Sequence, residues 1–310
     1  MKTILLTGCT GFLGSHLLRT LLKFSEYKII ALKRSFSNTY RIIDLINDDR
    51  IRFVDIDTLN EDIQVFIRNS HINIIIHTAT SYGRTDTDPT EILQTNLIFP
   101  LTLLEAGVKN ELELFINTDS YFNKPNQSYK TLLDYSLSKK SFNIWLEYLS
   151  QKTKIVNLRL EHMYGDYDSA DKFVEYVIQK IAIKQNPSIA LTHGQQKRDF
   201  VFIDDVCTAF MSVLINYEKY HFHYLLCDVG TGMGVSVFDF VTTIKHLSES
   251  KTELQFGALP YREDEIMSSV ADNSVLLNWG WNAFFSYKEG IRKILGIYNT
   301  KNISRINDCE

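Results

Sequence analysis

The chain has 310 residues, of which 45% are hydrophobic and 23% charged, and its formal net charge is −4. It is long enough to bury a large core in one or two lobes, and its weak, interspersed charge argues against a nucleic-acid-binding surface. No apolar run approaches the roughly 18 residues that a membrane-spanning helix needs, so we expect no membrane partner.

The first half of the chain alternates short β-rich runs with helix-like segments. Runs that are apolar on both faces are expected as strands at 2–8, 28–34, 51–57, 72–80, 113–120 and 154–162. Amphipathic stretches at 15–24 and 92–109 are expected as helices between them. This alternation predicts an α/β fold with a doubly wound parallel sheet of the Rossmann type, covered by helices on both sides.

After about residue 165 the alternation breaks. The remaining elements are expected as a helix at 171–184, a strand followed by a helix at 198–216, and a strand at 220–230. Because no linker separates the two halves, we expect a smaller, mixed C-terminal lobe formed by returns of the chain. The predicted division is a Rossmann domain at 1–165 with a return at about 199–228, and a second lobe of 166–198 and 229–310.

The stretch TGCTGFLG follows the first expected strand and leads into the first expected helix. Its glycines are Gly8, Gly11 and Gly14, a spacing typical of a dinucleotide-binding turn. Glycine allows a positive φ and lets backbone N–H groups approach a pyrophosphate, and the helix start at Phe12 and Leu13 adds the positive end of its dipole. The stretch therefore predicts a bound nicotinamide dinucleotide.

The second expected strand ends in Lys33 and Arg34, where an NAD-binding protein usually carries an acid for the adenosine ribose. A cationic pair can instead meet the 2′-phosphate of NADP. We therefore expect NADPH/NADP+ as the cofactor rather than NADH. The alternative is that both side chains are simply solvated.

Tyr135 and Lys139 stand at the head of an expected helix, in DYSLSKKSF. Their spacing places both on one helical face. A neighbouring ammonium favours a phenolate, so we expect Lys139 to lower the pKa of Tyr135, which can then pass a proton to a carbonyl oxygen. This pair is common by chance, but together with the glycine turn it is far more specific.

The chain resembles the extended short-chain dehydrogenase/reductase superfamily, in its branch of NAD(P)-dependent nucleotide-sugar epimerases and dehydratases. The stretches that carry the resemblance run almost end to end and are TGCTGFLG, VDID, HTAT, NTDS, LRLEHMYG, KRDFVFIDDV, VGTGMGVS and YREDE. The resemblance implies a cofactor-binding Rossmann domain and a C-terminal lobe that binds a nucleotide diphosphate sugar. Besides the residues above, it assigns to the cofactor Asp55, Ile56, Thr78, Ala79, Thr80 and Asn96, and to the substrate Tyr82, His162, Arg198 and Arg262.

The substrate residues on the C-terminal side leave alternatives open. Arg198 and Arg262 suit a diphosphate because guanidinium groups meet phosphate oxygens bidentately, but each also has an adjacent acid, Asp199 or Glu263, as an ordinary partner. His162 stands where many relatives carry an asparagine, and a packed or backbone-bonded histidine is the alternative to a substrate contact.

The strand end FINTDSYF separates the possible reactions. Thr118 matches the family's catalytic Ser/Thr, whose hydroxyl bonds the C4 oxygen of the sugar. In the 4,6-dehydratases an Asp–Glu pair follows this threonine, whereas this chain has Asp119 followed by Ser120. A serine hydroxyl is a poor general base near neutral pH, so dehydration is not expected. The pattern T-D-x-x-F, which ends at Phe122, resembles the 4-keto-deoxysugar reductases.

The expected activity is NADPH-dependent reduction of the C4 ketone of a CDP- or dTDP-linked 4-keto-6-deoxyglucose to a 6-deoxyhexose of the fucose or abequose type. Thr118, Asp119, Ser120, Tyr135 and Lys139 are the expected catalytic residues, and Tyr135 and Lys139 also contact the cofactor. The resemblance further implies a cytoplasmic homodimer that serves surface polysaccharide (lipopolysaccharide O-antigen) biosynthesis. A C4-epimerase with tightly bound NAD and a non-catalytic NADP sensor are the alternatives.

Three further patterns predict structure rather than chemistry. His221 and His223 alternate in the strand expected at 220–230, but without a third ligand nearby we expect no metal site. GTGMG, which begins at Gly230, is expected as a turn that connects the lobes. Free thiols in a reducing cytoplasm are expected from four scattered cysteines, Cys9, Cys207, Cys227 and Cys309.

Overall fold

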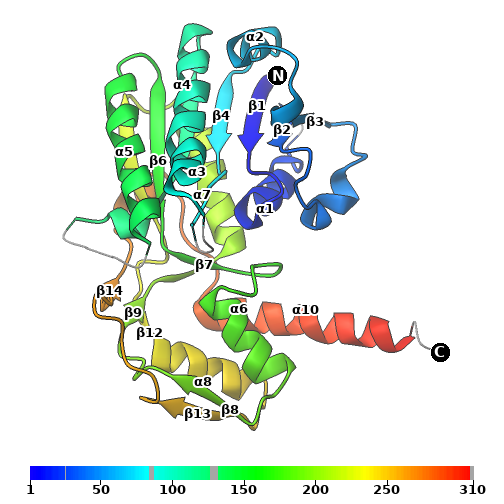
Figure 1. The fold of residues 1–310 in the computed structure, drawn as a ribbon, viewed down its shortest axis with the longest axis vertical. Helices are drawn as coiled ribbons and strands as arrows, with labels where there is room; N and C mark the ends of the chain where they lie inside the picture. The colour runs from blue at the N-terminus through cyan, green and yellow to red at the C-terminus, as the bar shows by residue number, and fades with distance from the viewer. Residues whose placement is uncertain (25, 84–86, 126–131, 308–310) are drawn as a thin grey trace.

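The computed structural model describes residues 1–24, 26–83, 87–125 and 132–307 (Figure 1). Its centre is a seven-stranded parallel sheet with the strand order β11-β6-β5-β4-β1-β2-β3. The strands are β1 (Lys2–Thr7), β2 (Tyr27–Lys33), β3 (Ile51–Asp55), β4 (Ile74–His77), β5 (Leu114–Ser120), β6 (Lys154–Leu160) and β11 (Tyr224–Val229). The predicted doubly wound parallel sheet is confirmed.

Helices cover both faces of this sheet. They are α1 (Phe12–Leu21), α2 (Ile63–Asn69), α4 (Phe99–Lys109), α5 (Leu133–Leu149) and α7 (Ile203–Asn216). Ile4 and Leu6 of β1 pack in one core with α1 and α7, whereas Leu5 packs in a second core with α2, α4 and α5. Since side chains alternate between the two faces of a strand, nearly continuous apolar strands require a helical layer on each side.

The helix expected at 92–109 is interrupted. It begins as α3 (Pro89–Leu93), passes through a π turn at η3 (Gln94–Ile98) and continues as α4. Such turns often lie at functional sites. Here the π turn contains Asn96, whose side chain is fully buried.

The C-terminal lobe lies beyond the carboxyl end of the main sheet, in the lower part of Figure 1. Its small sheets pair β7 with β10, β8 with β13, and β9 with both β12 and β14. The elements are β7 (His162–Tyr164), α6 (Phe173–Ile178), η5 (Gln179–Ile183), β8 (Ser188–Leu191), β9 (Lys197–Arg198), β10 (Phe200–Phe202), β12 (Val235–Ser236), α8 (Val237–Leu247), β13 (Glu253–Phe256), β14 (Ser268–Ser269), α9 (Ser274–Asn278) and α10 (Tyr287–Asn307). The division into two domains at the stated boundaries stays a prediction.

His221 and His223 do not lie on the strand expected for them. The strand expected at 220–230 begins only at Tyr224, so His221 and His223 precede β11 instead of alternating on it. In the described ranges, no group of three or more His, Cys, Asp or Glu side chains is arranged to hold a metal.

Cys9, Cys207 and Cys227 are buried free thiols, and Cys309 lies outside the described residues. None of the helices described is long and apolar enough to cross a membrane.

Candidate active site

A cleft of about 1680 Å³ opens at the carboxyl ends of β1, β4 and β5, between the main sheet and the C-terminal lobe. In open α/β sheets this is where ligands bind, because the chain connections diverge at the point between β1 and β4. The predicted site residues that line it are Gly8, Gly11, Phe12, Leu13, Gly14, Lys33, Arg34, Ile56, Thr78, Ala79, Thr80, Tyr82, Thr118, Asp119, Ser120, Tyr135, Lys139, His162, Arg198 and Arg262. Asp55 and Asn96 do not line it.

The glycine turn packs too tightly for any side chain at two of its positions. A Cβ on Gly14 would lie 2.1 Å from the carbonyl oxygen of Gly8, and one on Gly8, whose φ is +70°, would lie 2.6 Å from the amide nitrogen of Ala79. Gly11 precedes α1, and no side chain caps this helix start in the part of the chain described. The first amides of α1 therefore face the cleft as a site for an anion such as a pyrophosphate.

The cationic end of β2 has its own partners. Lys33 forms an ion pair with Asp55, and the Arg34 guanidinium lies 4.6 Å from the centre of the Phe36 ring. A third cation, Arg41, also lines the cleft and donates a hydrogen bond to the carbonyl oxygen of Tyr167, 2.9 Å away. Sequence reasoning missed Arg41 because it lies outside any motif, in a 3-10 turn after β2.

Asn96 holds the loop that follows β4. Its side chain accepts a hydrogen bond from the Ser81 amide and donates to the Ser81 carbonyl, both at 2.8 Å. It also donates to the Ser138 hydroxyl of α5 at 3.0 Å. Thr80, which lines the cleft, donates to Asn96 as well. The structure therefore gives Asn96 the contacts of a residue that positions this loop, and a direct cofactor contact stays a prediction.

Thr118 and Asp119 point to opposite faces of β5. The Thr118 hydroxyl donates to the carbonyl oxygen of His77 at 3.1 Å. The Asp119 carboxylate accepts from the side chains of Asn123 at 2.6 Å and Asn143 at 2.7 Å, and from the Ser120 amide at 2.8 Å. Burial raises the pKa of Asp119, although these hydrogen bonds oppose the rise. Its contacts tie β5 to α5, and its predicted catalytic role stays untested.

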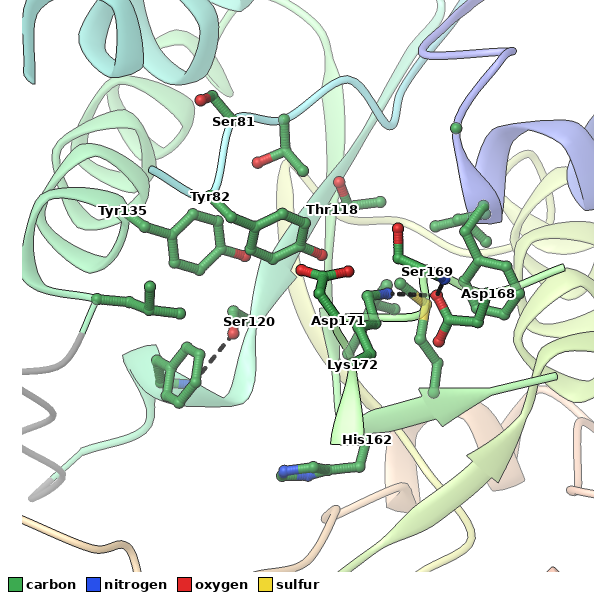
Figure 2. A pocket seen from close by; sticks show the side chains of 18 of the residues that line it. Ser81, Tyr82, Thr118, Ser120, Tyr135, His162, Asp168, Ser169, Asp171 and Lys172 are labelled. Atoms are coloured by element: carbon green, nitrogen blue, oxygen red, sulfur yellow. Dashed lines mark hydrogen bonds and ion pairs between the residues drawn. The ribbon is translucent and has the colours of Figure 1, made fainter. Parts of the chain in front are cut away.

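Tyr135 and Lys139 both reach the cleft from α5, as their spacing predicts. The Tyr135 ring stacks on Tyr82, with 5.0 Å between ring centres, and both lie near Thr118 and Ser120 in Figure 2. The Lys139 ammonium donates to the backbone carbonyl of Thr118 at 2.9 Å. Tyr135, Lys139 and Thr118 therefore all line the cleft, and Lys139 links α5 to the end of β5.

The expected lowering of the Tyr135 pKa is wrong for this structure. Burial raises the pKa of Tyr135 well above its ordinary value, the neighbouring Tyr82 adds to the rise, and a hydrogen bond with Ser120 opposes it. Lys139 is directed to the Thr118 carbonyl and not to the phenol. Burial also lowers the pKa of Lys139 to about 8. Spacing alone could not reveal these effects, because they depend on solvent exclusion.

The C-terminal side of the cleft carries His162 and Arg198. The centre of the His162 ring lies 4.2 Å from that of the Tyr121 ring, and its Nδ1 atom lies 3.9 Å from a carboxylate oxygen of Glu161, beyond hydrogen-bond distance. Burial lowers the pKa of His162. Arg198 forms an ion pair with Glu265 and not with the adjacent Asp199. Arg262 lines the same part of the cleft.

Asp199 instead fixes the turn that contains GTGMG. Its carboxylate accepts hydrogen bonds from the amides of Thr231 at 2.8 Å, Gly232 at 2.9 Å and Ala271 at 3.1 Å. None of the residues 230–234 lines the cleft. This arrangement agrees with the interpretation of GTGMG as a connecting turn.

A segment that sequence reasoning missed borders the cleft opposite the tyrosines. Figure 2 shows Asp168, Ser169, Asp171 and Lys172 facing Tyr82 across the cleft. Lys172 pairs with Asp168 at 2.9 Å, and its ammonium lies 4.9 Å from the Phe12 ring centre at the glycine turn. The segment lies between β7 and α6, and only the three-dimensional fold brings it to this position.

Comparisons with known proteins agree with this arrangement. The model of the NAD dependent epimerase/dehydratase family matches residues 4–226. A CDP-abequose synthase of Salmonella muenchen is 38% identical over 96% of this chain and 98% of that protein. A CDP-abequose synthase of Salmonella typhimurium (strain LT2) is 36% identical, over 94% of this chain and 97% of that protein. Among solved structures, a UDP-glucose 4-epimerase from Thermotoga maritima with UDP-glucose has the same fold, with a TM-score of 0.80, 21% identity, and coverage of 96% of this chain and 99% of that chain.

Proposed function

This chain belongs to the NAD dependent epimerase/dehydratase family, and from that premise we propose that it reduces the C4 ketone of a nucleotide 4-keto-6-deoxyglucose with NADPH. The product is a CDP- or dTDP-linked 6-deoxyhexose of the fucose or abequose type. One observation carries the proposal: Tyr135, Lys139 and Thr118 line the same cleft as the glycine turn, and Lys139 bonds the backbone of Thr118. Ser120 stands where dehydration would need a carboxylate base, which favours reduction.

The residues at the sheet end fit a dinucleotide cofactor. The uncapped start of α1 suits its pyrophosphate, and the residues at 78–80 together with Tyr135 and Lys139 would hold its nicotinamide ribose. When bound, the reduced nicotinamide supplies the hydride that forms the new C–H bond at C4. Lys33 and Arg34, with Ile56 beside them, favour NADPH over NADH because guanidinium and ammonium groups suit a 2′-phosphate. Lys33 would then exchange Asp55 for the phosphate.

The residues of the chain handle the proton. As hydride adds to C4, the carbonyl electron pair moves to the C4 oxygen, which takes the phenolic proton of Tyr135. The buried Tyr135 phenol carries its proton at neutral pH, and the alkoxide that forms at C4 is a stronger base than a phenolate, so the proton moves to the C4 oxygen. Thr118 would turn its hydroxyl from the His77 carbonyl to the developing alkoxide and stabilise it. Lys139 holds the end of β5 through the Thr118 carbonyl.

Arg198, Arg262, His162 and Tyr82 are the proposed substrate contacts. Each guanidinium has five N–H donors, so Arg198 keeps donors for a diphosphate while it is paired with Glu265. Tyr82 stacks on the proton donor and would border the hexose.

Redox stoichiometry tests the reaction. Purified protein is mixed with NADPH and with CDP- or dTDP-4-keto-6-deoxyglucose, and both NADPH absorbance and sugar product are followed. We expect one NADPH consumed for each 6-deoxyhexose formed. A family structure with this fold is an epimerase, so C4 epimerisation with tightly bound NAD and no net reductant consumption is the alternative outcome. A chain that binds cofactor but turns over no sugar would be a sensor.

We further propose that the enzyme is a cytoplasmic homodimer that serves O-antigen biosynthesis. Support for the dimer is an exposed apolar stripe on α5, where Leu137, Ile144 and Tyr148 are 51%, 70% and 64% exposed. A second copy of the chain would cover this stripe. Light scattering should show that Ile144→Asp converts a dimer to a monomer, whereas Ile215→Asp, the same change at an exposed position of α7, leaves the dimer intact.

A further inference from the structure

A small apolar cluster surrounds the proposed proton donor. Its buried members Phe122 and Ile266 pack with Tyr135, and partly buried neighbours complete it. We call this cluster the aromatic wall, and its members are Tyr82, Tyr121, Phe122, Leu132, Tyr135 and Ile266. All of them line the cleft. Ile266 comes from the C-terminal lobe, so the wall is completed by residues far apart in the sequence.

The rings of the wall enclose the phenol on more than one side. Tyr82 stacks on Tyr135 with an interplanar angle of 25° and 5.0 Å between ring centres. Phe122 meets Tyr135 edge-on, at 6.2 Å and 86°. Tyr121 lies against Phe122, with 4.1 Å between ring centres. A ligand atom that reaches the phenol oxygen therefore brings its near neighbours against aromatic and aliphatic carbon.

Two of the hydroxyl groups beside the wall already have partners. The Ser120 hydroxyl accepts a hydrogen bond from the Phe122 amide at 3.3 Å, and the Thr118 hydroxyl donates to the His77 carbonyl. A hydroxyl group placed against Phe122 and Ile266 would lose its water without gaining a matched partner there. Such a loss is unfavourable, whereas a methyl group at the same place gains apolar contact.

The chemistry of the hexose decides which atom meets the wall. In the proposed reaction the C4 oxygen takes its proton from Tyr135, and C6 is only two bonds away from C4. We propose that the aromatic wall recognises the C6 methyl group and so selects 6-deoxyhexoses over hexoses that carry a C6 hydroxyl. This inference rests on the proposed function, because the position of C4 defines that of C6.

The test compares nucleotide sugars that differ only at C6. The matched pairs are the nucleotide-linked fucose and galactose, and the nucleotide-linked 6-deoxyglucose and glucose, each as the CDP and the dTDP form. Their dissociation constants are measured by titration calorimetry with the NADP+-loaded protein. We expect the 6-deoxy member of the pair with the correct C4 configuration to bind about 10- to 100-fold more tightly. Equal affinities in every pair would overturn the inference.

Two substitutions of Ile266 provide a matched comparison, since threonine has the shape of valine but carries a hydroxyl group in place of one methyl group. Ile266→Val should keep the preference of the wild type. Ile266→Thr places a hydrogen-bonding group in the wall, so it should reduce the preference about 5-fold. The same preference in both variants would contradict the role of the wall. If Ile266→Thr does not fold, Phe122→Tyr adds a hydroxyl at a second position and should move the preference in the same direction.

The result separates this inference from the proposed reaction. If the protein consumes NADPH with a 4-keto-6-deoxy sugar but binds both members of every pair equally, only the recognition of C6 is wrong. If it consumes no NADPH with either nucleotide, the proposed reduction is wrong whatever the binding preference.

Discussion

The two halves of the cleft are built in different ways. On the side of the glycine turn, the lining residues come from the ends of neighbouring parallel strands and the start of α1, and Gly8 and Gly14 leave no room for a Cβ. On the opposite side, the surface consists of side chains such as His162, Arg198 and Ile266, which come from separate segments of the C-terminal lobe. The first half follows from a short local pattern, whereas the second exists only when distant segments pack together.

The largest expected effect concerns the point where the two halves meet. Tyr135→Phe should lower kcat about 100- to 10,000-fold, because it removes the proton donor and leaves the ring stacked on Tyr82. Cofactor affinity should change little, and a fluorescence titration with NADPH checks this. Tyr220→Phe, at an exposed position before β11, is the control and should keep full turnover. An active Tyr135→Phe enzyme would show that another group supplies the proton.

The backbone half should tolerate no added atom at Gly14. Gly14→Ala places a Cβ against the carbonyl of Gly8, so it should lower the free energy of unfolding by about 1–3 kcal/mol and abolish cofactor binding. Urea denaturation and NADPH titration measure the two effects. At Gly296 of α10 an added Cβ would meet no atom within 4 Å, and Gly296→Ala should therefore retain both properties. A stable, cofactor-binding Gly14→Ala protein would refute the close packing of the turn.

A smaller effect should distinguish the two cofactors at the end of β2. Arg34→Ala should raise the KM for NADPH about 10-fold, because a charge-assisted hydrogen bond to the 2′-phosphate is lost. The KM for NADH serves as the internal control and should stay unchanged. Equal changes for both cofactors would mean that Arg34 does not recognise the phosphate.

The last expected effect is a pH dependence of stability due to Lys139, which is seen only when the pH is varied. Its pKa is about 8 in the folded protein, below the ordinary value of 10.5. Between these values the unfolded chain binds more protons, so this residue's contribution to stability is complete above pH 10.5 and is lost as the pH falls through about 8. The difference in unfolding free energy between the wild type and Lys139→Met should therefore grow as the pH rises across this interval. If this difference in unfolding free energy stayed constant with pH, burial would not lower the pKa of Lys139.

The features that could be predicted from the sequence are those with a short-range physical cause. Alternating apolar strands and helices require the parallel sheet, and the spacing of Tyr135 and Lys139 brings both to one face of α5. Because side chains alternate along a strand, Asp119 lies on the face of β5 opposite to Thr118. This position explains why its carboxylate accepts hydrogen bonds from the side-chain amides of Asn123 and Asn143. A local pattern carries enough information for each of these features.

Other features depend on which distant segments meet. Lys172 reaches the ring of Phe12, and Ile266 reaches Tyr135, across large separations in the chain. The pKa of Tyr135 rises where a fall is expected, because burial excludes water from the phenol. The sequence does not reveal this burial, since the residues that surround Tyr135 are distant from it along the chain. Arg41 lies outside every motif, and the contacts of Asn96 with the loop after β4 exist only in the folded chain.

The buried carboxylate of Asp199 positions the Arg198 guanidinium without pairing with it, because Arg198 pairs with Glu265. The Asp199 carboxylate accepts hydrogen bonds from the amides of Thr231, Gly232 and Ala271, and so holds two separate segments of the chain against the residue next to Arg198. The backbone at Arg198 is therefore held in place by its neighbour, and the direction of the Arg198 side chain is fixed before an anion binds. Loss of the Asp199 hydrogen bonds would leave the Arg198 guanidinium poorly positioned, although no residue that contacts the ligand had been changed.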